Sequence, residues 1–267
     1  MFSYSWYLDA VADKWGGVIN ENYDTLFPVT YTSKLGVNQF YQAFFTREFE
    51  VMGKDFSIIN ALNSLKNKFK FILFRSSQSI DLQNKHRIYQ TLNLKETFAD
   101  NYSKNAKRLI KKSAKHYTYK VIECKSELID LIKVNVAHKI KEFTPKNIKK
   151  LEKLMTFASQ NKKGETIGVF DNDTIVGAGF FFTDKSTITY LKGASEDEAK
   201  KNGAMYGLLD FAFHQYQNDY STFDFGGANI ENVAVFYKKL GGTDKTYFEY
   251  QINNLPLWFK GLKQLKK

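Results

Sequence analysis

The spacing of apolar residues in the last third of the chain changes from helical to extended and back. A helix is predicted after Asn202 because apolar residues recur three and four positions apart: Met205, Leu208, Leu209, Ala212, Phe213 and Tyr216. A strand over 222–225 leads into Gly226-Gly227, and a second helix over 231–239 ends at Gly241-Gly242. This unit brings a glycine turn to the end of a strand, which is where open α/β sheets usually build binding sites.

Three strand-like runs precede this unit, over 166–170, 174–182 and 186–192, and their short polar connections suit hairpins. A further strand-like run follows over 245–252. The predicted order from 166 to 252 is therefore β-β-β-α-β-α-β. The helix between strands 186–192 and 222–225 acts as a crossover, so these two strands are expected to be parallel neighbours that diverge at one end.

The segment before Leu92 repeats this order in a reduced form. Helices are predicted over 5–11 and from an Asp55 cap to about Lys66, with Phe56, Ile59, Leu62 and Leu65 on one face. Strands are predicted over 18–19, 27–31, 69–74 and 87–92. Two more helices are expected over 126–136 and 144–160, the latter with Pro145 at its first position. We therefore expect two lobes, residues 1–120 and 121–267, with the binding site mainly in the second.

The motifs around the glycine turn resemble those of a known family. Asp224-Phe225-Gly226-Gly227, followed by Phe236-Tyr237-Lys238-Lys239-Leu240-Gly241-Gly242, resembles the DFGG…FxKxFGG pattern of FemABX-like proteins, a branch of the GNAT acyltransferase superfamily. Segments 4–8 and 103–112 are similar to other parts of these proteins, and the resemblance covers roughly residues 3–250. It implies an α/β (α+β) fold of tandem GNAT-like lobes, with mixed central sheets flanked by helices.

The charge is uneven along the chain. Of 267 residues, 43% are hydrophobic, which is ample for a core, and the net charge is +11. Residues 101–121 contain no acid, and a basic helix is predicted there, capped by Ser103 and apolar only at Ala106, Leu109, Ile110 and Ala114. Its cationic face suits a pyrophosphate or a nucleic-acid backbone. The alternative is a solvated helix surface, since lysines are frequent throughout the chain.

Several classes of chemistry find no support in the sequence. The four histidines have no paired spacing, so no metal site is predicted. Cys124 follows a strand-like run and is expected to be structural, and a single cysteine suits a reducing compartment. No run approaches the ~20 apolar residues that span a bilayer, and the N-terminus does not resemble a signal peptide. We expect a cytoplasmic protein. The chemistry that remains is acyl transfer by direct attack of an amine on an acyl donor.

The donor stays open between aminoacyl-tRNA, which FemABX proteins use, and acyl-CoA; no tightly bound cofactor is expected. GNAT enzymes hold the pyrophosphate of acyl-CoA in a Gln/Arg-x-x-Gly-x-Gly/Ala loop at a helix start. Here Gly203 fits that pattern, but Lys200 replaces Gln or Arg and Met205 replaces the small residue. The donor-binding candidates are Lys200, Gly203, Lys107, Arg108 and Lys111.

The resemblance singles out Lys238, since the lysine of the FxK motif lies near the donor phosphates or the developing oxyanion; alternatively Lys238 is a surface lysine at a helix end. Asp224 either takes the proton of the acceptor amine or caps the helix that begins near Asn229. Tyr237 is a general acid or a core aromatic. The substrate-binding candidates are Tyr190, Lys192, Gly226, Gly227, Asn232 and Phe236. Strand alternation places Tyr190 and Lys192 on the same face.

Three functions remain, and the sequence leaves the oligomeric state open. The first is a FemABX-like acyltransferase that moves an acyl or aminoacyl group to an amine acceptor, with a cell-wall precursor and tRNA as candidate partners. The second is an acyl-CoA-dependent N-acetyltransferase acting on a small amine. The third is a non-catalytic polyanion-binding module. The poor acyl-CoA loop favours the first over the second, and the DFGG and FYKKLGG motifs favour either enzyme over the third.

Overall fold

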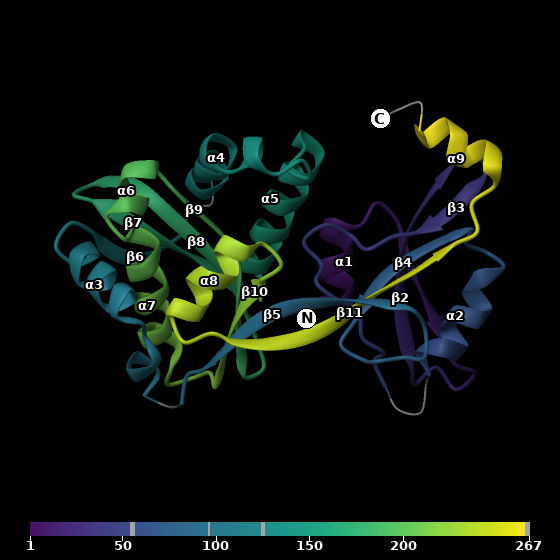
Figure 1. Ribbon diagram of the computed structural model, residues 1–267, viewed down its shortest axis with the longest axis horizontal. Coiled ribbons are helices and arrows are strands. Elements are labelled where there is room, and N and C mark those ends of the chain that lie inside the picture. The colour runs from purple at the N-terminus through teal and green to yellow at the C-terminus, as the bar shows by residue number, and fades with distance from the viewer. Residues whose placement is uncertain (54–56, 96, 124–125, 265–267) are drawn as a thin grey trace. The chain divides into compact units, whose positions relative to one another are not determined.

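The chain forms two compact units, each with its own core (Figure 1). The computed structural model describes residues 1–53, 57–95, 97–123 and 126–264. Unit 1 comprises Met1–Arg87 and Thr246–Lys267, and unit 2 comprises Ile88–Lys245. These divisions differ from the expected boundary at residue 120. The chain passes between the units inside two strands, each of which contributes residues to both units. Those strands are β5 (Asn84–Asn93) and β11 (Thr243–Asn253).

Unit 1 is a small mixed sheet with strand order β1-β2-β3-β4-β11. Its other elements are α1 (Ser5–Val11), β1 (Trp15–Ile19), β2 (Leu26–Lys34), β3 (Val37–Phe40), α2 (Ile58–Lys66), β4 (Phe71–Ser76) and α9 (Leu257–Gln264). The first three strands form an antiparallel meander, and α2 then crosses over so that β4 lies parallel to β3. Strand β11 adds antiparallel to β4, from Phe248↔Ser76 to Asn253↔Phe71.

An aromatic core holds unit 1 together, with Phe74 stacked on both Phe40 and Tyr250. Helix α2 begins after Ser57, and the expected Asp55 cap and Phe56 lie outside the described residues. Its buried face is formed by Ile58, Ala61, Leu62 and Leu65. Ile59, which was expected on that face, is 37% exposed, because the apolar stripe starts one residue earlier.

Unit 2 has strand order β5-β10-β9-β8-β7-β6. Its elements are η1 (Phe98–Asn101), α3 (Lys104–Ser113), β6 (Thr118–Ile122), α4 (Ser126–Asn135), η2 (Ala137–Lys139), α5 (Pro145–Gln160), β7 (Gly164–Asp171), β8 (Thr174–Asp184), β9 (Thr187–Ser195), α6 (Asp197–Lys201), α7 (Ala204–Tyr216), β10 (Thr222–Gly227) and α8 (Glu231–Lys239). Strands β6 to β9 are an antiparallel meander, and the α6–α7 crossover leads to β10, parallel to β9.

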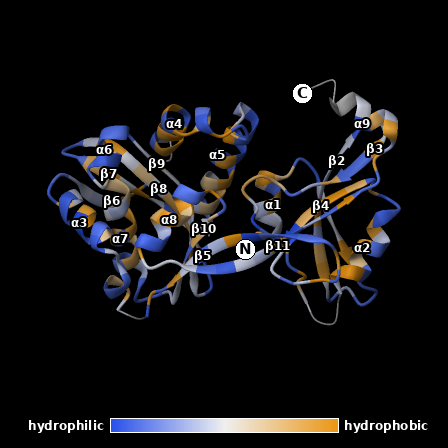
Figure 2. Ribbon diagram, viewed as in Figure 1, coloured by the Kyte–Doolittle hydropathy of each residue, from blue (hydrophilic) through white to orange (hydrophobic). Residues whose placement is uncertain are grey.

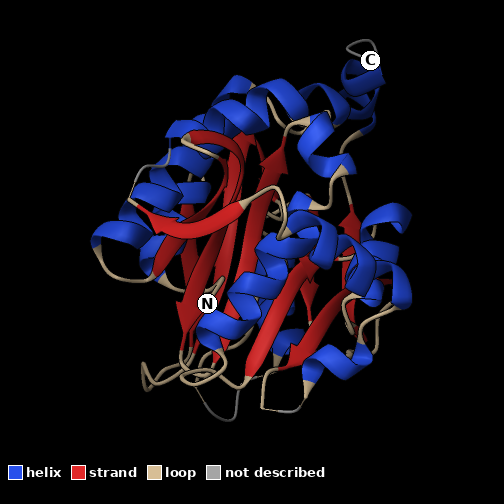
Figure 3. Cartoon of the chain, turned by 90° about the vertical axis from the view of Figure 1, so that its left-hand side faces the viewer, coloured by secondary structure: helices blue, strands red, loops and turns tan. Residues whose placement is uncertain are grey.

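Helices cover both faces of this second sheet (Figure 3). Helix α7 packs on β7, β8 and β9, and α3 packs on the outside of α7. Helix α4 contacts β8 and β9, and α5 contacts β7. Phe181 and Phe213 lie in the core between the sheet and α7. None of the helices in the described part of the chain is long and apolar enough to cross a membrane.

Both units therefore follow one plan, a meander, a helical crossover, a parallel strand and a closing antiparallel strand. The closing strands are exchanged between the two halves of the chain: β5 follows β4 in sequence but pairs with β10, and β11 follows α8 but pairs with β4. The predicted class, α/β (α+β) with mixed sheets flanked by helices in two related lobes, is confirmed.

Candidate active site

The parallel strands β9 and β10 separate in the middle of unit 2. Their pairing runs from Thr222↔Thr187 to Asp224↔Thr189, and no later pair joins them in the described residues. Both strands nevertheless continue, β9 to Ser195 and β10 to Gly227. The predicted parallel, diverging pair is thus confirmed. Beyond the separation, ladder pairing between the strands no longer occupies their facing N–H and C=O groups, which can instead bind a ligand.

A short hydrogen bond fixes the glycine turn at the end of β10. The backbone N–H of Gly226 donates to Oδ1 of Asp224 at 2.8 Å, and Gly226 has φ +79°, which favours glycine. Helix α8 starts later, after an Ile230 N-cap that makes no side-chain capping bond. The expectation that Asp224 caps this helix is therefore wrong: the short reach of its buried carboxylate closes the turn two residues on.

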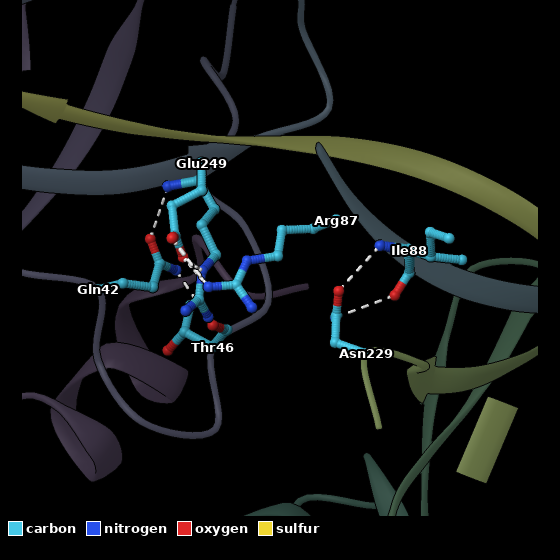
Figure 4. Close-up of polar contacts among 7 residues, drawn as sticks. Gln42, Thr46, Arg87, Ile88, Asn229 and Glu249 are labelled. Carbon is cyan, nitrogen blue, oxygen red and sulfur yellow. Dashed lines mark hydrogen bonds and ion pairs between the residues drawn. The ribbon is translucent and has the colours of Figure 1, made fainter. Parts of the chain in front are cut away.

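Asn229 connects the loop after this turn to β5 through two hydrogen bonds (Figure 4). Strand β10 leaves β5 after Gly227↔Tyr89. The Asn229 amide then takes the place of a strand, because its Oδ1 accepts from the Ile88 N–H and its Nδ2 donates to the Ile88 carbonyl, each at 3.1 Å. Sequence reasoning missed this role, although a side-chain amide that follows a glycine turn is a natural substitute for a peptide group.

Three aromatic rings meet where the strands separate. Tyr237 on α8 stacks on Phe225 of β10, with ring centroids 4.8 Å apart, and lies edge-on to Tyr190 of β9 at 6.4 Å. Burial raises the pKa of the Tyr237 hydroxyl, and the negative charge of Asp224 raises it further. Burial also raises the pKa of Tyr190. Both hydroxyls are therefore protonated at neutral pH and can donate a proton or a hydrogen bond.

Lys238 is the next residue along α8, and it forms an ion pair. Its Nζ lies 2.8 Å from Oδ2 of Asp244, whose other oxygen accepts from Nε2 of Gln90 at 2.7 Å. The hydrogen bonds from Lys238 and Gln90 lower the pKa of Asp244. The Lys238 side chain is 55% exposed, so water and ligands can reach it. An anionic ligand would have to compete with Asp244 for this ammonium group.

Tyr190 and Lys192 lie on opposite faces of the sheet, contrary to the expectation from alternation. The register of β8 and β9 pairs Phe181 with Tyr190 but Phe180 with Lys192, so β9 carries a bulge at Leu191. One extra residue reverses the alternation of side chains. Tyr190 points toward α7, and its hydroxyl occupies the space where a side chain at Gly193 would begin. Lys192 points to the other face.

The remaining substrate-binding candidates lie on or near α8. Phe236 packs edge-on against Tyr206 of α7, with ring centroids 4.7 Å apart, and so ties α8 to α7. Asn232 is exposed in the first turn of α8. Gly227 ends β10 and is exposed, which leaves the loop after the turn open to solvent.

Known structures share the fold over nearly the whole chain. A crystal structure of FemX has a TM-score of 0.64 at 12% identity, covering 99% of this chain and 94% of that one. The chain has the fold of FemX and of the tandem GNAT proteins. The C-terminal domain of a putative lysylphosphatidylglycerol synthetase from Agrobacterium fabrum has a TM-score of 0.59 at 11% identity, covering 90% and 84%. A tandem GNAT protein from the clavulanic acid biosynthesis pathway has a TM-score of 0.53 at 7% identity, covering 94% and 87%.

Sequence comparison adds nothing to this likeness: no family model matches the chain, and no curated protein sequence does either. The structural similarity at such low identity shows the fold alone.

The tandem GNAT fold brings the basic helix α3 beside the start of α7. Gly203 has φ +86°, and a side chain there would begin 2.5 Å from the carbonyl oxygen of Leu109. Close backbone contact therefore requires glycine at this position. Ser103 caps α3 as predicted, accepting from the Ala106 N–H, whereas Ala114 is exposed and Ser113 takes its expected place in the buried stripe. Lys107, Arg108 and Lys111 are exposed on the hydrophilic outer side of α3 (Figure 2).

The helix start that follows β9 is acidic. Helix α6 begins with Asp197 and Glu198 after Glu196, and Lys200 is exposed at its other end. The acyl-CoA loop predicted around Gly203 lies one helix further on, at the start of α7, where the first turn has no acid and Gly203 packs against the Leu109 carbonyl. Cationic groups are concentrated instead on α3. No group of three or more His, Cys, Asp or Glu in the described residues is placed to hold a metal ion, and Cys124 lies outside those residues.

Proposed function

We propose that this protein is an acyltransferase that moves an acyl or aminoacyl group to an amine by direct attack, at the separation of β9 and β10. The observation that supports this most is the end of β9–β10 pairing at Thr189↔Asp224, with the Tyr237 ring beside it. Backbone N–H groups that ladder pairing between β9 and β10 no longer uses are suited to polarise a donor carbonyl and to stabilise the oxyanion that forms from it.

The proposed step balances its protons within the site. The amine nitrogen attacks the acyl carbon, a C–N bond forms, and the C–O or C–S bond to the leaving group breaks. Tyr237, whose hydroxyl is protonated at neutral pH, donates a proton to the leaving group. The Asp224 carboxylate accepts the proton that the amine loses. Transfer of this proton from Asp224 to the Tyr237 phenolate then restores the starting state.

Two observations favour an aminoacyl-tRNA donor over acyl-CoA. The start of α7, where an acyl-CoA loop would hold its pyrophosphate, packs at Gly203 against the carbonyl oxygen of Leu109, and the exposed lysines and arginine of α3 form a cationic surface beside α7. A long polyanion suits such a surface better than a single pyrophosphate does. The same surface supports a second candidate, a polyanion-binding module without catalysis. In FemABX-like enzymes the acceptor is a cell-wall precursor, which makes such amines the first acceptors to test.

Replacement of Tyr237 by Phe tests the proposal, because it keeps the stacking on Phe225 and removes only the hydroxyl. Charged tRNAs and a panel of acyl-CoAs would first be screened by thermal shift, since a ligand of the native state raises the Tm. Turnover with the donor that binds should then fall by about 10²-fold or more in Tyr237→Phe. Tyr206→Phe, a half-buried tyrosine on α7, serves as the control. Binding of tRNA without any acyl transfer would instead support the binding module.

A further inference from the structure

Lys192 occupies an unusual place for a lysine. It lies on β9 three residues beyond Thr189, the last residue paired with β10, and the bulge at Leu191 turns it away from Tyr190 and Tyr237. Its Nζ lies 5.0 Å from the ring centre of Phe143, which stands just before the N-cap of α5. Lys192 therefore faces the side of the sheet that α4 and α5 cover, next to the separation of the strands.

The Lys192 side chain is partly buried, and its ammonium group has no anionic partner among the described residues. The ammonium group lies over the face of the Phe143 ring. Burial lowers the pKa of Lys192 to about 8. A buried cation that lacks a carboxylate is unfavourable for stability, and such groups are usually paired or serve a ligand. A lysine placed in this way is suited to pair with an anionic group of a ligand.

The surroundings of Lys192 also favour an anion. The segment that forms α4, η2 and α5, residues 126–163, carries nine lysines against four acids. Phe143 is followed by Thr144, the N-cap of the 16-residue helix α5, so the positive end of that helix lies near the ammonium group. Both contributions raise the positive potential on this face of the sheet.

We propose that Lys192 binds an anionic group of the acyl acceptor, a carboxylate or a phosphate, on the face of the sheet covered by α4 and α5. This inference rests on the proposed acyl transfer, and it assigns the two substrates to opposite faces. The donor lies on the side of α7, α8 and α3, and the acceptor reaches the separated strands from the side of α4 and α5. We therefore expect the acceptors to be amines that also carry a carboxylate or a phosphate, and not polyamines.

Footprinting of lysines tests the site without any assay of transfer. The protein is labelled with an amine-reactive reagent at pH 8, and the labelling rate of each lysine is measured by peptide mass spectrometry. The probes are pairs of amines that differ in the anionic group: phosphoethanolamine against ethanolamine, and glycine against glycinamide. Lys120 is the matched control, because its Nζ also lies over a ring, 4.1 Å from the centre of Phe170, but it is exposed on β6.

We expect the anionic member of at least one pair to slow labelling of Lys192 by about fivefold or more, with no effect on Lys120. The pair that protects identifies the group as phosphate or carboxylate. Protection of Lys192 by neither anionic amine, or equal protection by the neutral analogues, would overturn the proposal. Protection by anions in a protein that transfers no acyl group would keep the site and remove the proposed function.

Turnover gives an independent readout once a donor is known. In Lys192→Met the KM for the anionic amine should rise by about 10- to 100-fold relative to its neutral analogue, the range expected for a hydrogen bond to a charged group. Lys192→Arg should recover part of that preference, because it restores the cation. Transfer with the same preference in wild type and Lys192→Met would reject the inference while leaving the acyltransferase assignment in place.

Discussion

At the scale of single residues, the pairing of Lys238 with Asp244 makes its role testable. An exposed ion pair of this kind contributes little to stability. If Lys238 stabilises the donor phosphates or the oxyanion, Lys238→Ala should lower turnover by about 100-fold or more and leave the Tm nearly unchanged. Lys201→Ala is the matched control, because Lys201 is an exposed helix lysine that also pairs with an acid, Glu198. Retained turnover in folded Lys238→Ala would remove Lys238 from the mechanism.

The buried ammonium of Lys192 predicts a stabilising mutation. Its pKa of about 8 lies below the ~10.4 of an unfolded lysine. Between these two values the unfolded chain binds more protons, so the cost of this group is full below pH 8 and disappears as the pH rises toward 10. Lys192→Met should therefore raise the free energy of unfolding by about 1–3 kcal/mol at pH 7, and by progressively less above pH 8. Urea titrations at several pH values would measure this.

The control for that experiment is Lys120→Met, which removes an exposed lysine and should show no such pH dependence. A loss of stability in Lys192→Met, or a gain that stays constant from pH 7 to pH 10, would contradict the burial argument.

The position of Lys192 also shows a limit of sequence reasoning. Alternation predicts the face of a side chain only while the register is regular. The sequence of residues 189–193 contains no signal that predicts the bulge at Leu191.

At the scale of elements, strong periodicity made some segments predictable. The bounds of α1 and α8 agree with the sequence, and α5 starts after the expected Thr144-Pro145 signal, with Thr144 accepting from the Asn147 N–H. Strand β6 was anticipated only at its end, by the strand-like run before Cys124, because it is short, mostly exposed and follows the basic run, so it lacks an apolar pattern. Helix α6 was missed for a similar reason, since one polar turn between β9 and Asn202 resembles a loop.

Helix α3 gives a prediction at this scale. Changing Lys107, Arg108, Lys111 and Lys112 together to Gln should weaken binding of tRNA and flatten its dependence on salt, because fewer counterions are released. Changing Lys146, Lys149, Lys150 and Lys153 of α5 to Gln is the matched control for total charge. Filter binding at several salt concentrations would measure both. Equal affinity of wild type and the α3 variant at low salt would make α3 a solvated face without a ligand.

At the scale of the whole molecule, the exchange of closing strands could not be predicted from the sequence. A strand pattern shows that residues 245–252 are extended but does not name their partner. Within unit 1 that partner is β4, and a polar cluster strengthens the pairing (Figure 4). Glu249 of β11 accepts from Nε of Arg75 at 2.7 Å and from Nη2 of Arg87 at 2.8 and 2.7 Å. Burial would raise the pKa of Glu249, but these two arginines outweigh it and lower the pKa.

The exchange predicts which pieces of the chain fold. A fragment of residues 88–245 contains every strand of unit 2, including the part of β5 that pairs with β10. A fragment of residues 121–267 lacks β5 and α3, and its β11 has lost β4 as a partner. We expect the first to unfold cooperatively in urea and to give dispersed NMR spectra. The second should be disordered or aggregated, because β10 and β11 would both expose unpaired edges. Cooperative folding of 121–267 with a stability equal to that of 88–245 would mean that the exchanged strands are dispensable, and that the boundary at residue 120 describes the folding units better.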